Sequence, residues 1–167
     1  RFSTEFPKPC ITEMGGKNPT IVTANADLDK AVDGVARSAF GFSGQKCSAC
    51  SRVYVERPVY DAFIDKLVAR TQSLKVGDPA DRDTYVGPVI DEKAQERFDD
   101  AVKSAKGGTV RAGGHRLTDG DYGKGTFVEP TVVDGLPLEH ELFHKEPFLP
   151  FVLVAAVDSL DEALAPA

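Results

Sequence analysis

Apolar residues recur at helical spacing in three stretches of the chain. The stretches begin close to Asp27, Pro58 and Asp91, and glycine follows each of them. An aspartate is a good N-cap, and a proline is well placed in the first turn of a helix. The spacing therefore predicts three amphipathic helices, whose apolar positions are Leu28, Val32, Val35, Ala36, Ala39 and Phe40; Val59, Phe63, Leu67, Val68 and Leu74; and Ala94, Phe98, Ala101, Val102 and Ala105.

Shorter apolar or alternating stretches between these helices predict strands. They cover residues 20–23, 52–56, 109–112, 127–133 and 150–157, and the glycine-rich stretch 119–125 is expected to be a surface loop. The last strand is almost continuously apolar, as in a strand that is covered on both faces. Strands that alternate with helices predict an α/β fold, a mainly parallel sheet flanked by helices in three layers. A chain of 167 residues is long enough for one such domain, so 1–167 is read as a single domain.

Composition narrows the possible partners. The net charge is −6, with Lys and Arg scattered along the chain, which argues against a nucleic-acid partner. No apolar run approaches the roughly 20 residues that cross a bilayer, so no membrane partner is expected. Three cysteines without a secretory signal favour a reducing, cytoplasmic location.

The first candidate for chemistry is the stretch 42–52, which contains Cys47 and Cys50. Gly44 would let the backbone turn close to a substrate, and Lys46 would favour a thiolate at Cys47. Taken alone, however, the stretch fits two small buried hydrophobic residues better, because free cysteines are usually buried. A redox pair stays open. Only Cys10 and three dispersed histidines remain to complete a zinc site, so no metal is predicted.

Two further segments carry carboxylates beside residues that shape the backbone. Glu13 precedes Gly15-Gly16, where a carboxylate held against a cleft would become a useful base. Glu146 and Phe148 precede the last apolar strand, where the carboxylate would accept hydroxyl groups and the ring would pack on a flat ligand. Each segment alone is better explained as a surface strand end or a prolyl turn.

Together the three segments resemble the aldehyde dehydrogenase superfamily. Residues 13–17 match its Glu-Leu-Gly-Gly-Lys motif with Met14 in place of Leu, residues 42–47 match its cysteine motif, and residues 146–151 match Glu-[Ile/Val]-Phe-Gly-Pro-Val. Pro147, Leu149 and Phe151 depart from the last motif. Their order agrees with the family, as does the separation of 34 residues between Glu13 and Cys47 (47 − 13 = 34).

The resemblance implies a role for each matching position. Cys47 is the nucleophile that forms a thioester, and Glu13 is the base that activates water. Glu146, Phe148 and Met14 contact the cofactor, NAD or NADP. The resemblance further implies a small-molecule aldehyde as substrate and a homo-oligomeric parent. The nucleotide-binding and oligomerisation parts lie outside this chain, so the isolated fragment is expected to be inactive.

Residues 44–52 also resemble the subgroup that includes the pyrroline-5-carboxylate (glutamate semialdehyde) dehydrogenases. In that subgroup the positions of Lys46 and Ser48 lie near the substrate carboxylate, which implies glutamate semialdehyde or a related semialdehyde. Two alternatives remain: a CoA-acylating aldehyde dehydrogenase, and a non-catalytic α/β interaction module.

Overall fold

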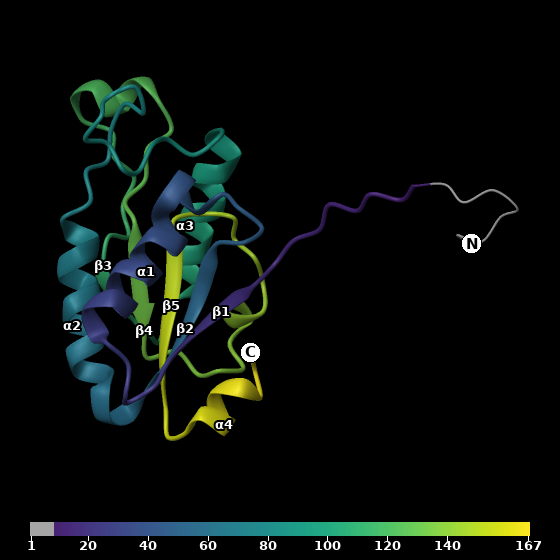
Figure 1. The fold of residues 1–167 in the computed structure, drawn as a ribbon. Helices are drawn as coiled ribbons and strands as arrows, with labels where there is room; N and C mark the ends of the chain where they lie inside the picture. Colours follow the sequence, from purple (N-terminus) through teal and green to yellow (C-terminus); the bar gives the residue numbers. More distant parts are fainter. Residues whose placement is uncertain (1–8) are drawn as a thin grey trace, which may run out of the picture.

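The fold was analysed in a computed structural model, which describes residues 9–167. It is a five-stranded, mostly parallel sheet flanked by helices, as predicted (Figure 1). The strands are β1 Asn18–Val22, β2 Cys50–Glu56, β3 Thr109–Ala112, β4 Thr131–Asp134 and β5 Phe151–Val157. The helices are α1 Leu28–Phe40, α2 Arg57–Gln72, α3 Glu92–Ser104 and α4 Leu160–Leu164. Short 3₁₀ turns occupy Gly41–Gly44, Gly120–Lys124 and Glu141–Phe143.

The sheet has the order β1-β2-β5-β4-β3. Strands β1, β2, β5 and β4 run parallel, and only the edge strand β3 is antiparallel to its neighbour β4. The segments that lead into β1, β2 and β5 therefore meet at one edge of the sheet, the amino edge. The opposite, carboxyl edge is where β4 ends at Asp134 and β5 runs toward α4.

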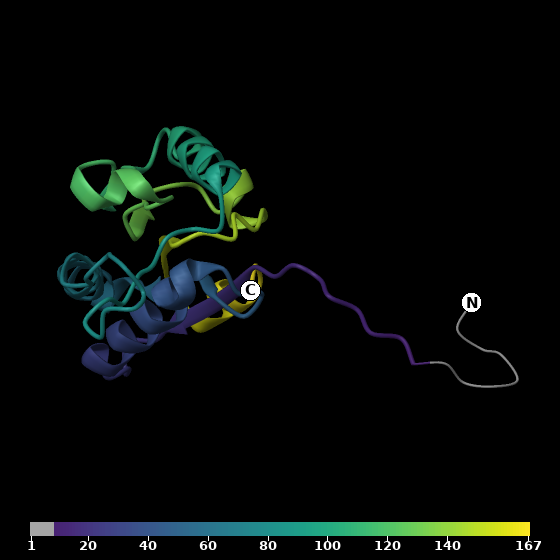
Figure 2. The same cartoon turned by 90° about the horizontal axis from the view of Figure 1, so that it is seen from above.

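Alternation along the central strands builds one apolar core on each face of the sheet. In β2, Val53 and Val55 pack with α1 and α2, whereas Tyr54 between them packs with α3 on the other face. Strand β5 divides in the same way between Val154 and Leu153. Figure 2, seen from above, shows α1 and α2 on one side of the strands and α3 on the other.

The predicted caps begin the predicted helices. The side chain of Asp27 accepts a hydrogen bond from the backbone N–H of Lys30, at 3.2 Å, and that of Asp91 accepts one from Ala94, at 2.8 Å. Each bond satisfies a backbone donor that the first helical turn leaves free. The first turn of α2 contains Pro58, also as expected.

One predicted strand was placed differently. The stretch 127–133 divides at Pro130, and only its second part belongs to β4. Residues before the proline pair antiparallel with 115–117 instead: the N–H of Leu117 bonds to Phe127 O, and the N–H of Glu129 bonds to His115 O, both at 3.0 Å. Proline has no N–H, so it interrupts the pairing at this point.

The chain before β1 is an extended segment that leads away from the body of the protein (Figure 1), and only its part next to β1, around Gly15 and Gly16, stays close to the sheet's loops. Across the described part of the chain, none of the helices combines the length and the apolar character that a bilayer crossing needs.

Candidate active site

The structure brings all seven predicted site residues to one open cleft at the amino edge of the sheet. The cleft has a volume of about 620 Å³. Three segments line it, one before β1, one before β2 and one before β5, and they contribute Glu13 and Met14; Lys46, Cys47 and Ser48; and Glu146 and Phe148. Residues distant in sequence meet here because parallel strands share one amino edge. Ligand sites of α/β sheets more often lie at the carboxyl ends.

The loop before β2 presents Cys47 in a backbone that is strained. After α1 ends, Phe42 and Ser43 have φ values of 56° and 55°, in the left-handed region, and Gly44 follows at 68°. Side chains other than glycine pay an energetic cost there. A tight turn then carries the cysteine, closed by a hydrogen bond of 3.0 Å from the Ala49 N–H to Lys46 O. Cys47 is exposed on this turn.

The second cysteine after this loop, Cys50, is buried, unlike Cys47. Cys50 is 3% exposed and lies in the core between the sheet and α1. The hydroxyl of Thr20 donates to its sulfur at 3.2 Å, and the Cys50 N–H bonds to Ser38 Oγ at 3.1 Å. Burial raises the pKa of the Cys50 thiol, so the thiol stays protonated and inert. This position separates Cys50 from the cleft and argues against a redox pair with Cys47.

Neighbouring segments fix the strained loop. The hydroxyl of Ser43 donates to Gly87 O at 2.9 Å, and the side-chain oxygen of Gln45 accepts from the Ile90 N–H at 2.9 Å. Gly44 lies directly on the carbonyl of Leu149, where a Cβ would collide. The loop is therefore held by the segment between α2 and α3 and by the segment before β5.

The segment before β5 carries Glu146 and Phe148 against the Glu13 segment. Phe148 has a φ of 56° and is 39% exposed, with its ring at the cleft. A Cβ at Gly15 would collide with the Glu146 carboxylate, so the two segments pass in contact. Among residues 9–167, the non-glycine residues with positive φ are Phe42, Ser43 and Phe148. All three lie in loops that border the cleft, and such strain often marks functional sites.

A partly buried cation lies behind the cleft. Burial and the nearby Arg52 guanidinium lower the pKa of Lys17 to about 8, although Cys50 and Glu146 act in the opposite direction. Arg52 donates its Nε–H to the carbonyl of Lys17 at 2.7 Å. Lys46, the cation that the sequence predicts near the substrate, extends toward Gly41: a Cβ built at Gly41 would lie 3.5 Å from Lys46 Nζ and 3.5 Å from the Tyr85 hydroxyl.

The chemistry of the site follows from these groups. An exposed thiol and two carboxylates border one space, so it offers a nucleophile and acceptors for protons or hydroxyl groups. A carboxylate next to an exposed aromatic ring suits the ribose and the flat ring of a nucleotide, so Glu146 and Phe148 fit a nicotinamide cofactor. Within the described range 9–167, no group of three or more His, Cys, Asp or Glu side chains could hold a metal ion.

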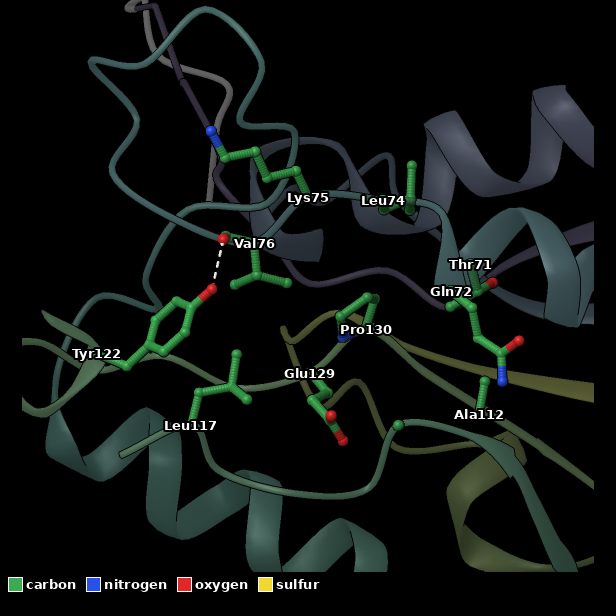
Figure 3. A pocket seen from close by; sticks show the side chains of 11 residues that line it. Thr71, Gln72, Leu74, Lys75, Val76, Ala112, Leu117, Tyr122, Glu129 and Pro130 are labelled. Atoms are coloured by element: carbon green, nitrogen blue, oxygen red, sulfur yellow. Dashed lines mark hydrogen bonds between the residues drawn. The ribbon is translucent and has the colours of Figure 1, made fainter. Parts of the chain in front are cut away.

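Another hollow, of about 380 Å³, lies where α2 ends against the segment 112–130. Figure 3 shows its lining, in which the Tyr122 hydroxyl donates to Val76 O at 2.9 Å. It shares no lining residue with the cleft around Cys47. None of its residues belongs to the three segments 13–17, 42–47 and 146–151 that carry the candidate site.

Sequence reasoning missed the residue that ties the Glu13 segment to the cysteine turn. The side-chain amide of Asn18 donates to the carbonyl of Cys47 at 2.6 Å and to that of Ala49 at 3.2 Å. Its position beside the Glu13 motif was visible in the sequence, but its partners were not.

Comparison with known proteins gives consistent matches. The model of the aldehyde dehydrogenase family matches residues 2–167. The 1-pyrroline-5-carboxylate dehydrogenase 1 of Halalkalibacterium halodurans is 44% identical over 94% of this chain and 30% of its own length. The corresponding enzyme of Geobacillus sp. is 42% identical over the same shares.

Solved structures of similar proteins superpose closely on this chain. The betaine aldehyde dehydrogenase of Staphylococcus aureus, in complex with NAD+, superposes with a TM-score of 0.89 at 35% identity, over 92% of this chain and 31% of that one. HpcC from Thermus thermophilus superposes with a TM-score of 0.88 at 34% identity, over the same shares. The chain thus spans about 30% of the length of the curated relatives that it matches.

Proposed function

Because this chain belongs to the aldehyde dehydrogenase family, we propose that the whole protein oxidises an aldehyde to a carboxylic acid with NAD or NADP. The observation that carries the proposal is the cleft itself. The nucleophile, base and cofactor candidates come from three separate segments and line one space of about 620 Å³. Cys47 is exposed there, whereas Cys50 is buried.

In the first stage, the Cys47 thiolate attacks the carbonyl carbon of the aldehyde. A C–S bond forms, and the carbonyl electron pair moves to oxygen, where the backbone N–H of Cys47 donates a hydrogen bond to the oxyanion. NAD or NADP, when bound, supplies the two-electron oxidant for the aldehyde C–H bond. As that bond breaks and the C=O bond re-forms, Cys47 is left as a thioester.

In the second stage, Glu13 takes a proton from water, and the water oxygen attacks the thioester carbonyl. The C–S bond breaks, so that the carboxylic acid leaves and the Cys47 thiolate is restored. Glu13 lines the same cleft as Cys47, which supports its assignment as the base.

The residues before β5 are proposed to hold the cofactor. Glu146 would accept hydrogen bonds from the hydroxyls of the nicotinamide ribose, and Phe148 would lie beside the nicotinamide ring. Met14, on the facing segment, would complete the contact. All three line the cleft of Cys47, so a cofactor held by them would lie next to the nucleophile.

The substrate is proposed to be a semialdehyde that carries a carboxylate, glutamate semialdehyde or a close relative. Lys46 and Ser48 flank the nucleophile and line its cleft. The Ser48 hydroxyl, and the Lys46 ammonium group once it turns from Gly41 toward the cleft, would bind the carboxylate. The similarity to enzymes named 1-pyrroline-5-carboxylate dehydrogenase supports this choice. The cytoplasmic location, the homo-oligomer and the single-domain reading of 1–167 stay predictions.

The test is an aldehyde panel on the full-length protein with NAD and with NADP. Cys47→Ser should lower the rate of aldehyde oxidation by a factor of about 10³ or more, whereas Cys50→Ser should keep most of it. Glu13→Gln should keep the first burst of reduced cofactor but slow later turnovers by a factor of about 10². Full activity of Cys47→Ser would refute the mechanism.

The same panel, together with thiol labelling, decides among the alternatives. An absolute requirement for CoA would assign the protein to the acylating branch, and oxidation of fatty or aromatic aldehydes but not of glutamate semialdehyde would refute the substrate proposal. Equal, slow labelling of Cys10, Cys47 and Cys50 by iodoacetamide would favour a non-catalytic module. We expect the isolated 167 residues to oxidise no aldehyde, and robust turnover by them would contradict this.

A further inference from the structure

We propose that Asn18 is a positioning residue, whose side-chain amide fixes the turn that carries the nucleophile. This inference rests on the proposed role of Cys47. Asn18 is the first residue of β1, five positions after Glu13 in the sequence.

The amide of Asn18 uses both of its hydrogens on the cysteine turn. It donates to Cys47 O at 2.6 Å and to Ala49 O at 3.2 Å. The turn closes on its other side through the bond from the Ala49 N–H to Lys46 O. The carbonyl of Cys47 is therefore held, and with it the backbone rotation that sets the direction of the Cys47 side chain.

This side-chain contact lies where the pairing of β1 with β2 shifts its register. Asn18 pairs with Cys50 but Pro19 pairs with Arg52, so Ser51 is an extra residue in β2. Pro19 has no N–H to offer. The regular ladder between β1 and β2 is interrupted next to the turn, and the Asn18 amide provides a contact there.

The contact also fixes the Glu13 segment relative to the nucleophile. A Cβ at Gly16 would lie 2.5 Å from the Cys47 carbonyl oxygen, so the segment that carries Glu13 touches the turn at a second point. Asn18 thus connects the segments of the nucleophile and the base. A displacement of about 1 Å between reacting groups can cost a factor of 10² in rate.

The experiment uses the full-length protein and two substitutions at Asn18. Asn18→Ala removes both hydrogen bonds. Asn18→Asp keeps the size of the side chain but turns a carboxylate toward two carbonyl oxygens, which repel it. The chain offers a matched control in Asn25, an exposed residue between β1 and α1, with the same two substitutions.

Asn18→Ala should lower kcat for the aldehyde by about tenfold or more, because the turn that carries Cys47 is misplaced, and KM should rise as well, because the proposed substrate-binding residues Lys46 and Ser48 lie on the same turn. Asn18→Asp should lower kcat further. Hydrogen–deuterium exchange of the peptide that spans residues 46–50 should be faster in both variants. The Asn25 variants should match the unsubstituted protein in every measurement.

Three results would overturn the proposal: unchanged exchange at residues 46–50, a kcat loss no larger than that of the Asn25 variants, or Asn18→Asp more active than Asn18→Ala. If the unsubstituted protein oxidises no aldehyde, the proposed function falls, and the exchange measurement alone decides whether Asn18 holds the turn.

Discussion

The amino and carboxyl edges of the sheet differ in how far their functional groups are exposed. At the amino edge, Cys47 and Phe148 are exposed, and the backbone around them adopts left-handed conformations. At the carboxyl edge, Asp134 is 3% exposed, and both of its carboxylate oxygens have partners. Its carboxylate accepts bonds from the Tyr60 hydroxyl at 2.8 Å, and from Arg111 Nε and Nη2 at 2.9 Å each.

This difference between the two edges indicates which structural signal points to the candidate site. Buried ionisable groups with shifted pKa values are often taken as markers of an active site. Here burial and the bond to Asp134 raise the pKa of Tyr60 strongly, yet the oxygens of Asp134 are occupied by Tyr60 and Arg111. The cleft around Cys47, behind which Lys17 also has a shifted pKa, is distinguished by strained backbone and by glycines in close contact with other segments. We therefore expect the carboxyl edge to stabilise the fold and the amino edge to carry the proposed chemistry.

The largest expected effect tests the stabilising role of the carboxyl edge. Asp134→Ala leaves Tyr60 and Arg111 without their shared partner, and we expect the free energy of unfolding to fall by about 3 kcal/mol. Urea unfolding of the full-length protein measures this, and kcat of the folded variant should be unchanged. Asp158→Ala is the control, because it removes only an exposed ion pair with Arg57 and should cost much less. Equal losses would contradict the comparison.

The next effect tests the amino edge. Gly44 has a φ of 68°, and a Cβ there would collide with the Leu149 carbonyl. Gly44→Ala should therefore cost about 2 kcal/mol of stability and, unlike Asp134→Ala, lower aldehyde oxidation by about tenfold or more. Gly34→Ala is the matched control: it lies in α1 with no atom within 4 Å of an added Cβ, so it should stabilise the helix by about 0.5–1 kcal/mol. A fully active Gly44→Ala would show that the close contact does not position Cys47.

Local signals were enough to predict most of the fold. An aspartate cap followed by helical spacing gave α1 and α3 correctly, because each signal acts within one turn of the same helix. The stretch 127–133 was misplaced because its alternation fits a strand on either side of Pro130. Which partner each half pairs with depends on residues 115–117 and on β5, and a local pattern does not contain that information.

The candidate site was likewise predictable from the sequence only in part. Three motifs that resemble those of one family, in the same order, singled out Cys47 and Glu13, and the structure brings their segments to one cleft. The roles of Asn18 and Ser43 could not be predicted. Their hydrogen bonds reach the Cys47 turn and Gly87, respectively, and those partners become neighbours only once the sheet has formed.

A smaller effect concerns the cation behind the cleft. The pKa of Lys17 is lowered to about 8 in the folded protein from 10.5, so between these values the unfolded chain binds more protons and stability rises with pH. Below pH 8 the whole cost of burying the charge is present. Lys17→Met should therefore stabilise the protein at pH 7, by about 1–2 kcal/mol because Lys17 is only partly buried.

This gain should shrink as the pH rises from 8 to 10.5, as followed by thermal unfolding of Lys17→Met and the unsubstituted protein over that range. Taking the difference removes the contribution of Cys50, whose raised pKa changes stability in the opposite direction above pH 9. Exposed Lys103 supplies the control, since Lys103→Met should show no such pH dependence. A gain that is the same at pH 7 and at pH 10.5 would mean that Lys17 is not strained by burial.

The smallest effect asks whether the carboxyl edge acts as one network. Tyr60→Phe removes a single hydrogen bond from Asp134, while both Arg111 contacts remain, so the free energy of unfolding should fall by only about 1 kcal/mol near pH 7. The raised pKa of Tyr60 means that the folded state holds its proton more tightly than the unfolded chain does. The stability of the unsubstituted protein should therefore decline as the pH rises above 10, and that of Tyr60→Phe should decline less. Urea unfolding at pH 7 and pH 11 measures both quantities.

A loss of stability in Tyr60→Phe as large as that in Asp134→Ala would show that the hydrogen bond from the phenol, rather than the contacts of Arg111, offsets the cost of burying the carboxylate. A fall in kcat would show that the two edges of the sheet are coupled.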